Sequence, residues 1–447
     1  MEHILFLTGR LAEKSLLRVL DSMAPAPFTW QVREIGVQVA ALMTADLIGR
    51  RLAAPPRADR VIVPGRCQGD LDGLGSHFGV PFERGPEDLK DLPQFFNQKA
   101  KPVDLSKFDI TIFAEIVDAP RLEVEAICAR ARHYRDEGAD VIDLGGLPAT
   151  PFPQLEDAVR ALKAEGCRVS VDSMDDQELL RGGRAGADYL LSLNRDTLWI
   201  AEEVPATPVL VARETGDEAS LFEAIDWCER KGRSYLADSI LDPLPFGLLS
   251  SLCRYQRLRE RYPAAPIFVG IGNLTELTEA DTSGINALLL GVCVELHAAA
   301  ILTTQVSNHA RRAIREADVA RRMMYAAREQ RSLPKGLSEQ LMTVHARHPF
   351  PDTPQEIAEI AAQIRDPSFR VQVAADGIHV YNRDGHHVET DAFALWPRLK
   401  LEGDGSHAFY MGVELARAQT AFMLGKRYVQ DQDLDWGCAV PRVAKDA

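Results

Sequence analysis

Short apolar runs in this sequence repeatedly end in a carboxylate or an amide. The segment GADVIDLGGLPATPFP, residues 138–153, places Asp143 at the end of one such run, directly before two glycines. A buried strand that carries an acid to its carboxyl end is the way in which a barrel presents a polar ligand group. We therefore expect one pocket rich in carboxylate and amide groups, with helix capping as the alternative for each residue. The further strand-end residues are Asp172 in RVSVDS, Asp238 and Asp242 in SYLADSILDP, and Asn273 in PIFVGIGN.

The elements that would position these groups lie in residues 108–330. This stretch contains eight apolar strand candidates, each followed by a helical stretch. Eight such units in about 220 residues are what a (β/α)8 barrel requires, and this count favours a TIM-type barrel over a doubly wound open sheet. The strand candidates are ITIFAE, ADVIDLG, RVSVDS, ADYLLSL, TPVLVA, SYLADS, PIFVGIG and AAILTT.

Residues 1–100 alternate strand and helix, which predicts a small parallel α/β domain of Rossmann-like or flavodoxin-like type. Two of its strands end in the same dipeptide, Gly9-Arg10 and Gly65-Arg66. In a parallel sheet, Arg10 and Arg66 would point into the crevice at the carboxyl edge and could hold an anion. The alternative is a pair of tight turns with surface arginines. Residues 85–106 are rich in proline and charge and are predicted to be a linker.

The chain beyond the barrel changes its pattern twice. Residues 331–365 are predicted to be a proline-rich joint with one helix, and residues 366–447 a C-terminal α+β domain. Period-two alternation with Asp376-Gly377 and Asp384-Gly385 predicts a three-stranded β-meander. The helix that follows is expected to pack on the sheet through apolar residues at three- and four-residue spacing. These are Phe409, Val413, Ala416, Thr420 and Leu424.

The composition of the chain argues against several classes of protein. The 447 residues carry a net charge of −14, which argues against nucleic-acid binding because such proteins usually present a basic surface. The seven cysteines lie far apart without a CxxC pair, so neither a disulfide framework nor a thiolate zinc site is expected. No apolar stretch approaches the roughly 18 residues of a membrane span, and no GxxxxGK[ST] or GxGxxG motif occurs. We expect a soluble, cytoplasmic enzyme of more than one domain.

Four barrel motifs taken together resemble the dihydropteroate synthase and pterin-binding methyltransferase superfamily. GADVIDLGG resembles its second-strand motif, VSVDS its third, ILDPLPFG its sixth-strand Asp-Pro loop, and IFVGIGN its seventh. The flanking regions resemble the dihydropteroate synthase-like proteins associated with methanopterin-linked one-carbon metabolism. The resemblance implies a pterin-binding (β/α)8 barrel that acts as a homodimer.

A pterin site also suits the chemistry of the strand-end residues. A reduced pterin presents its 2-amino group, N3-H and O4 on one edge, so its recognition needs buried carboxylates and amides. Asp172, Asp242 and Asn273 are therefore predicted to bind the pterin. Asp143 is predicted to contact the ring from its other side or to order a loop. With Asp172, Asp143 would also provide a negative lining that assists catalysis.

Glu115 ends the first barrel strand in FAEIVDAP, where true synthases carry an asparagine thought to help with the metal and the pyrophosphate. A carboxylate at this place can hold Mg²⁺ together with Asp118, because this ion prefers hard oxygen ligands. Glu115 can equally serve as a general base in catalysis. A helix-capping acid is the third interpretation.

The sequence departs from the synthase pattern at the last two strands. Asn273-Leu274 stands where synthases carry an Arg-Lys pair, and Thr303 and Gln305 stand where they carry an Arg and a His. The missing cations would hold the aryl substrate and the pyrophosphate, so folate synthesis from p-aminobenzoate is not expected. Asn273 instead resembles the methyltransferase branch, in which an asparagine contacts the pterin.

A phosphate group has one further candidate site. Barrel enzymes commonly bind phosphate with the loops after strands seven and eight, so Ser307, Asn308 and His309 are predicted to bind phosphate through backbone N–H groups. The next helix carries seven arginines between Arg311 and Arg331. They are interpreted as a solvated face paired with acids rather than as an anion clamp.

These features lead to one preferred function and two alternatives. The preferred function is an enzyme of tetrahydromethanopterin biosynthesis that joins a hydroxymethyl-dihydropterin diphosphate to an arylamine and releases pyrophosphate. The arylamine would be of the ribofuranosylaminobenzene phosphate type. The alternatives are a tetrahydropterin-dependent methyl or one-carbon transferase, and a non-catalytic pterin-binding carrier or scaffold.

Overall fold

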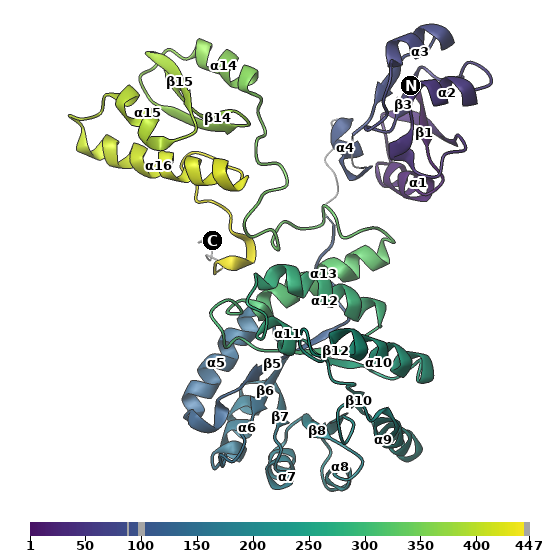
Figure 1. Ribbon diagram of the computed structural model, residues 1–447, viewed down its shortest axis with the longest axis vertical. Helices are drawn as coiled ribbons and strands as arrows, with labels where there is room; N and C mark the ends of the chain where they lie inside the picture. Colours follow the sequence, from purple (N-terminus) through teal and green to yellow (C-terminus); the bar gives the residue numbers. More distant parts are fainter. Residues whose placement is uncertain (87–88, 97–102, 442–447) are drawn as a thin grey trace. The chain divides into compact units, whose positions relative to one another are not determined.

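The computed structural model of the protein describes residues 1–86, 89–96 and 103–441. The chain divides into two compact units, Met1–Asp104 and Leu105–Ala447 (Figure 1). None of the helices in the described ranges is long and apolar enough to cross a membrane.

The N-terminal unit is a parallel four-stranded sheet of order β2-β1-β3-β4. Central strand β1 is apolar on both faces: Leu5 and Leu7 belong to one buried cluster, Ile4 and Phe6 to another. This arrangement confirms the predicted parallel α/β architecture. The strands are β1 (Glu2–Thr8), β2 (Phe28–Glu34), β3 (Arg60–Val63) and β4 (Phe82–Arg84), and the main helices are α1 (Glu13–Ser22), α2 (Ala45–Arg51) and α3 (Leu71–Phe78).

Part of the predicted linker belongs to the core of the N-terminal unit. Helix α4 (Leu92–Phe95) lies in this stretch, and Phe96 packs on Phe28 with ring centroids 4.4 Å apart. Aromatic burial therefore orders a segment whose proline and charge content suggested a linker. Residues 87–88 and 97–102 of the predicted linker lie outside the described residues.

The second unit contains an eight-stranded parallel barrel, as predicted. Strand β12 pairs with β5, and a bridge between Ala237 and Ile267 closes the ring between β10 and β11. The strands are β5 (Thr111–Ile116), β6 (Val141–Gly145), β7 (Arg168–Asp172), β8 (Tyr189–Leu193), β9 (Thr207–Leu210), β10 (Leu236–Ala237), β11 (Phe268–Gly270) and β12 (Ala300–Thr303). The helices are α5 (Val124–Glu137), α6 (Leu155–Ala164), α7 (Asp176–Ala185), α8 (Trp199–Glu203), α9 (Glu218–Lys231), α10 (Leu248–Arg261), α11 (Gly272–Thr275), α12 (Thr282–Glu295) and α13 (Ala313–Glu329).

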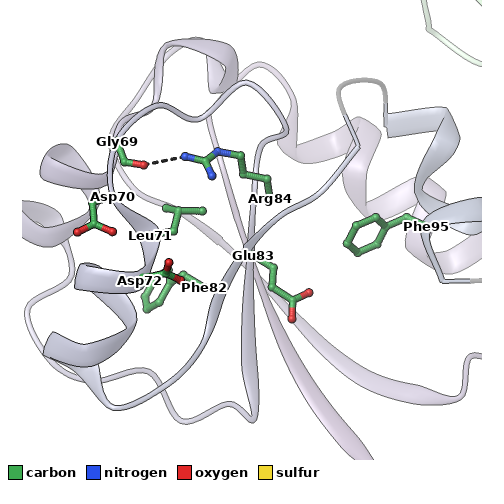
Figure 2. A pocket seen from close by; sticks show the side chains of 8 residues that line it. All are labelled: Gly69, Asp70, Leu71, Asp72, Phe82, Glu83, Arg84 and Phe95. Carbon is green, nitrogen blue, oxygen red and sulfur yellow. Dashed lines mark hydrogen bonds between the residues drawn. The ribbon is translucent and has the colours of Figure 1, made fainter. Parts of the chain in front are cut away.

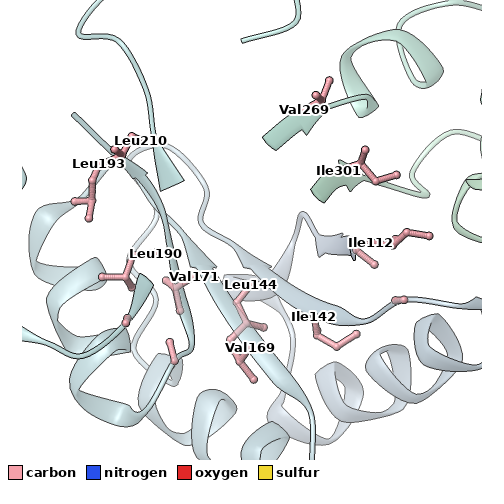
Figure 3. Close-up of a cluster of buried hydrophobic side chains, with 14 of the residues drawn as sticks. Ile112, Ile142, Leu144, Val169, Val171, Leu190, Leu193, Leu210, Val269 and Ile301 are labelled. Carbon is pink, nitrogen blue, oxygen red and sulfur yellow. The ribbon is translucent and has the colours of Figure 1, made fainter. Parts of the chain in front are cut away.

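Alternation along the barrel strands separates two cores. Residues such as Ile112, Ile142 and Leu144 join the large cluster between strands and helices (Figure 3). Phe113 and Val141 point the other way and belong to the cluster inside the ring. Because side chains alternate along a strand, Glu115 and Asp143, two positions after Phe113 and Val141, also point into the ring. Strand parity thus directs the acids that end these strands toward the mouth of the barrel.

Helix α13 corrects the prediction of a solvated arginine face. Arg321 is only 2% exposed and donates to the carbonyl oxygens of Ile110 and Gly138 and to the carboxylates of Asp140 and Asp318. The partners are acids, as expected, but the arginine is buried: Asp318 lies on α13 itself and Asp140 directly before β6. The arginine therefore fastens α13 to the start of the first barrel strand.

The chain after the barrel forms the predicted antiparallel meander and a long helix. The buried face of α16 differs from the prediction, because Phe409 is 76% exposed whereas Met411, Leu415 and Ala418 are buried. Both sets recur at helical spacing, so periodicity alone did not select the face. The elements are α14 (Pro354–Gln363), β13 (Arg370–Ala374), β14 (Gly377–Asn382), β15 (Gly385–Glu389), α15 (Ala392–Leu399) and α16 (Gly405–Leu424). Residues 442–447 of the predicted C-terminal domain lie outside the described residues.

Candidate functional site

Three carboxyl groups meet at the carboxyl ends of β5, β6 and β7. Glu115 is in register with Asp143, and Asp143 is in register with Ser170, two residues before Asp172. One carboxyl oxygen from each of the three acids lies within 4.8 Å of the others. The structure therefore brings together Glu115, Asp143 and Asp172, which are called the acidic triad below.

Asp143 is the most buried member of the acidic triad, with no exposed surface. Its Oδ1 accepts a hydrogen bond from the Ser170 hydroxyl on the neighbouring strand. Its Oδ2 is buried and has no hydrogen-bond partner among the described residues. A buried carboxylate oxygen without a partner is costly, so this atom is suited to receive a donor or a cation from a ligand.

Burial and mutual repulsion raise the pKa values of the acidic triad. Burial, with the nearby carboxylates of Asp172 and Glu276, raises the pKa of Glu115 to about 7. Burial and the carboxylate of Asp238 raise the pKa of Asp172 to about 7. The pKa of Asp143 is raised well above its ordinary value by burial and by the other two acids, and the Ser170 hydrogen bond offsets part of that rise. Perturbed carboxyl groups of this kind are typical of functional sites.

Asp238 lies at the end of β10 as a fourth acid of the mouth. It accepts hydrogen bonds from the Tyr255 hydroxyl and from the Ile240 N–H, the latter at 2.8 Å. Burial raises its pKa to about 6, and the two hydrogen bonds limit the rise. The sequence pattern identified Asp238 only as one strand-end acid among several.

Glu276, in the loop after β11, is a functional candidate that the sequence did not reveal. Its carboxylate accepts hydrogen bonds from the Thr304 hydroxyl at 3.0 Å and from the N–H groups of Val306 and Ser307 at 2.8 Å each. These donors belong to the loop after β12, about thirty residues away, where no local motif announces the contact. Its charge also raises the pKa of Glu115, so Glu276 acts electrostatically on the acidic triad.

In the loop predicted to bind phosphate, backbone N–H groups donate to a carboxylate of the protein itself. The Ser307 N–H, expected to face a phosphate, donates to Glu276 instead. The His309 ring lies 3.1 Å from the Thr275 carbonyl oxygen through Nε2, and Asn308 is exposed. The phosphate site at Ser307, Asn308 and His309 stays a prediction, with the Ser307 N–H already donating to the Glu276 carboxylate.

Asp242 and Asn273 lie on neighbouring loops but are engaged in contacts of their own. Asp242 forms an ion pair with Arg254 at 2.8 Å, and its side chain is 16% exposed. The Asn273 amide donates to the Leu241 carbonyl oxygen at 2.8 Å. The two predicted pterin ligands thus sit beside each other, outside the acidic triad.

The magnesium pair of Glu115 and Asp118 stays a prediction, and Asp118 has a partner of its own. Asp118 forms an ion pair with Arg130. An arginine at this place competes with a metal ion for the same carboxylate. Among the described residues, Glu115 clusters with Asp143 and Asp172 rather than with Asp118.

Arg10 and Arg66 lie on the N-terminal unit, directly after β1 and β3, and both are exposed. Strands β1 and β3 are neighbours, so the two arginines follow adjacent strand ends, as predicted. They belong to a different unit from the acidic triad.

The N-terminal unit also carries an open cavity of about 440 Å³ (Figure 2). Arg84 lies in it, but its guanidinium donates to the carbonyl oxygens of Cys67 and Gly69, each at 2.7 Å. The cation is thus used to hold the loop after β3. The cavity is lined by Gly69, Asp70, Leu71, Asp72, Phe82, Glu83, Arg84 and Phe95.

Comparisons with known proteins give likenesses to both parts of the chain. Residues 2–87 match a family described as a family of unknown function, DUF6513. The uncharacterized protein MJ0107 of Methanocaldococcus jannaschii is 26% identical, with 96% of this chain and 98% of the relative covered.

Among solved structures, the chain is similar to dihydropteroate synthases. That of Yersinia pestis, in complex with a sulfonamide drug, is 16% identical with a TM-score of 0.39 and covers 51% of this chain and 96% of its own. That of Xanthomonas albilineans, in complex with 7,8-dihydropteroate, is 19% identical with a TM-score of 0.37 and covers 51% and 94%. That of Coxiella burnetii, in complex with pteroic acid, is 18% identical with a TM-score of 0.37 and covers 50% and 94%.

Proposed function

We propose that the protein is a pterin-binding transferase of tetrahydromethanopterin biosynthesis. It joins a hydroxymethyl-dihydropterin diphosphate to an arylamine of the ribofuranosylaminobenzene phosphate type and releases pyrophosphate, as a cytoplasmic homodimer. The observation that carries the proposal is the acidic triad, one buried and two partly buried carboxyl groups whose oxygens lie within 4.8 Å of one another at a barrel mouth.

The acidic triad suits the donor-rich edge of a pterin. The 2-amino group and N3-H donate hydrogen bonds, so they require acceptors that are already desolvated. Asp172 and the unpartnered Oδ2 of Asp143 offer such acceptors. A carboxyl group whose pKa lies at about 7, as that of Asp172 does, can also donate to a ring nitrogen or to O4 when it holds a proton. Asp242 and Asn273 would complete the pterin site from the adjacent loops.

The proposed condensation needs little covalent help from the protein. The amine nitrogen forms a bond to the methylene carbon of the pterin while the bond from that carbon to the diphosphate oxygen breaks. Pyrophosphate leaves with the electron pair, and the amine proton passes to a carboxylate. Glu115 suits this role because its pKa of about 7 matches a general base at neutral pH. Asp143 would contribute negative charge beside the developing cation.

The acidic triad also fits Mg²⁺, the ion expected with a diphosphate. Three carboxyl oxygens within 4.8 Å and the unpartnered Asp143 Oδ2 form a set of hard oxygen ligands. In that arrangement Glu115, Asp143 and Asp172 would hold the ion, and Glu115 would serve as a metal ligand in place of the general base, with Asp118 held by Arg130. When bound, the ion would neutralise negative charge on the diphosphate and on the carboxylates.

A second candidate function is a tetrahydropterin-dependent methyl or one-carbon transferase. The contacts of Glu276 favour it, because the loop donors that could receive a diphosphate are taken. A ligand without phosphate would meet no repulsion at that loop. A non-catalytic pterin carrier would make the same binding contacts without turnover.

Two measurements on the full-length protein test the proposal. Calorimetric titration with a hydroxymethyl-dihydropterin should show binding, and Asp172→Asn should weaken it by about a hundredfold, since one buried charge-assisted contact is worth about 1.5–3 kcal/mol. Glu214→Gln, an exposed acid of the loop after β9, is the matched control and should bind as wild type does. Near-normal affinity in Asp172→Asn would remove this residue from the site.

Incubation with the pterin diphosphate and the arylamine phosphate then separates the candidates. Pyrophosphate release that depends on both substrates is the result expected of the synthase. Pterin binding without pyrophosphate release would favour a one-carbon transferase or a carrier. Absence of pterin binding would contradict all three.

A further inference from the structure

The loop after β12 presents a set of convergent hydrogen-bond donors. The N–H groups of the consecutive residues Val306 and Ser307 and the hydroxyl of Thr304 all point at one place. Successive N–H groups that converge in this way form a concavity that binds anions. In a (β/α)8 barrel, this is also the loop that commonly receives a phosphate. We call the three donors the anion cradle.

The anion cradle already holds an anion, the carboxylate of Glu276. Oε1 accepts from Thr304 at 3.0 Å and from Val306 at 2.8 Å, and Oε2 accepts from Ser307 at 2.8 Å. Both oxygens are used, and all three donors are satisfied. Although burial opposes ionisation, these hydrogen bonds lower the pKa of Glu276, so its carboxylate is ionised at neutral pH.

Further contacts hold the two loops together around this carboxylate. His309 lies 3.1 Å from the Thr275 carbonyl oxygen through Nε2, and the Thr282 hydroxyl donates to the His309 carbonyl oxygen at 3.2 Å. Residues before and after Glu276 are thereby tied to the segment that follows the anion cradle. The carboxylate is a fixed part of the mouth.

The surroundings make a second anion unfavourable at this place. Glu276 and Glu115 are close enough for each charge to affect the other, and the remaining acids of the mouth are Asp143, Asp172 and Asp238. A phosphate brought to the anion cradle would have to displace one carboxylate and face several others. Like charges in a partly buried site repel one another strongly.

We propose that Glu276 is a built-in anion that determines specificity, so that the barrel mouth excludes free phosphate and diphosphate from the anion cradle. The class of ligand that it selects presents neutral or cationic hydrogen-bond donors to the carboxylates, as a nitrogen-rich heterocycle does. The inference deepens the proposed function, since any diphosphate on the substrate must be bound away from Val306 and Ser307. Glu276 acts here by occupying the donors and by its charge.

The test uses inorganic pyrophosphate as the probe, titrated calorimetrically into the full-length protein with a chelator present. Wild type should show no binding. Glu276→Ala empties the anion cradle and removes one negative charge, so it should bind pyrophosphate at least about tenfold more tightly than wild type, which is a gain of at least about 1.4 kcal/mol. Glu279→Gln, an exposed glutamate of the same loop, removes the same charge outside the anion cradle and should leave binding absent.

Three results would overturn the inference. They are wild-type binding of pyrophosphate without metal, failure of a folded Glu276→Ala to gain binding, and an equal gain in Glu279→Gln. Circular dichroism and a thermal melt establish that each variant is folded, and Glu276→Ser, which also empties the anion cradle, replaces the alanine variant if the latter unfolds. The first of these results is measured on the wild-type protein and needs no variant. Pterin titration of wild type is a separate readout, so a failure to bind pterin would remove the proposed function and leave the role of Glu276 standing.

Discussion

At the scale of single residues, the acids at the mouth of the barrel lower the stability of the fold and provide contacts for a ligand. The acidic triad places three carboxyl groups in low-dielectric surroundings, and Asp143 Oδ2 has no hydrogen-bond partner among the described residues. Such groups raise the free energy of the folded state, since a buried charge loses its hydration. Functional sites commonly carry this cost.

Asp143→Asn should therefore stabilise the protein while it weakens pterin binding. The amide removes a buried negative charge and its oxygen can still accept from Ser170, the residue that bonds Asp143. We expect the thermal unfolding midpoint of the barrel to rise by about 2–4 °C, the effect of about 1 kcal/mol on a domain of this size. Differential scanning calorimetry with a chelator present measures the change. A lower midpoint would mean that the ionised carboxylate stabilises the native state.

The site residues at strand ends could be predicted, because an acid that directly follows a short apolar run is expected at the carboxyl end of a buried strand. Asp143 and Asp172 follow short apolar runs, and strand parity turns both of them into the barrel mouth. The partners of the other acids were not predictable. Arg254 lies twelve residues after Asp242, and the donors to Glu276 lie in another loop, so only the folded chain brings these groups together.

At the scale of elements, one helix holds the start of the barrel. Arg321 of α13 is 2% exposed and donates to Asp140, Asp318 and the Ile110 carbonyl oxygen. Arg321→Met should lower the free energy of unfolding by about 3–5 kcal/mol, because it leaves Asp140 without its cation and the carbonyl oxygens of Ile110 and Gly138 without their donor. Chemical denaturation measures this loss. Arg311→Met, at an exposed arginine preceding the same helix, should change it by less than about 0.5 kcal/mol.

The β-meander carries a pH dependence of its own. His379 lies between two partners, the Asp376 carboxylate at 2.8 Å and the His386 ring at 2.9 Å. Burial, with the positive charge that His379 or His387 would bring, lowers the pKa of His386, and Asp376 offsets part of this effect. Protonation of His386 is thus harder in the folded state than in the unfolded chain. Stability is fully present above the ordinary histidine pKa and is lost as pH falls below it.

Denaturation of the C-terminal region at pH 7.5 and at pH 5.5 measures this dependence, both values being chosen about one unit from the unperturbed histidine pKa. Wild type should unfold at a lower denaturant concentration at the acidic pH. His386→Gln should reduce the difference between the two pH values, whereas His77→Gln, at an exposed histidine of the N-terminal unit, should not. An unchanged difference in His386→Gln would assign the pH dependence to other groups.

Element types were predictable over most of the chain, but the faces of some elements were not. Eight apolar runs with helices between them favoured a barrel over a doubly wound open sheet. In α16, however, two sets of residues recur at helical spacing. The set with Met411 and Leu415 is buried, whereas Phe409 of the other set is exposed. Packing against a partner element decides such cases, and the partner is not visible in local sequence.

At the scale of the whole molecule, each unit has a core of its own. The apolar clusters of the N-terminal unit and of the barrel share no residues. The acidic triad and its neighbours Asp238 and Glu276 all lie within the second unit. The acids proposed to bind the pterin thus all belong to one unit.

A fragment of residues 105–447 should fold and bind the pterin with an affinity within about threefold of the full-length chain, a difference below 1 kcal/mol. Circular dichroism and calorimetry of the fragment measure both properties. A folded fragment that has lost the affinity would indicate that residues before Asp104, with Arg10 and Arg66 as the first candidates, complete the site.

The most direct test of the central claim is a crystal structure of the protein soaked with a reduced pterin. The account predicts density for the ring at the carboxyl ends of β5, β6 and β7, with the edge that bears the 2-amino group against Asp172 and the acidic triad. Density for the pterin at any other place, or an acidic triad that stays free of ligand at saturating pterin, would contradict it.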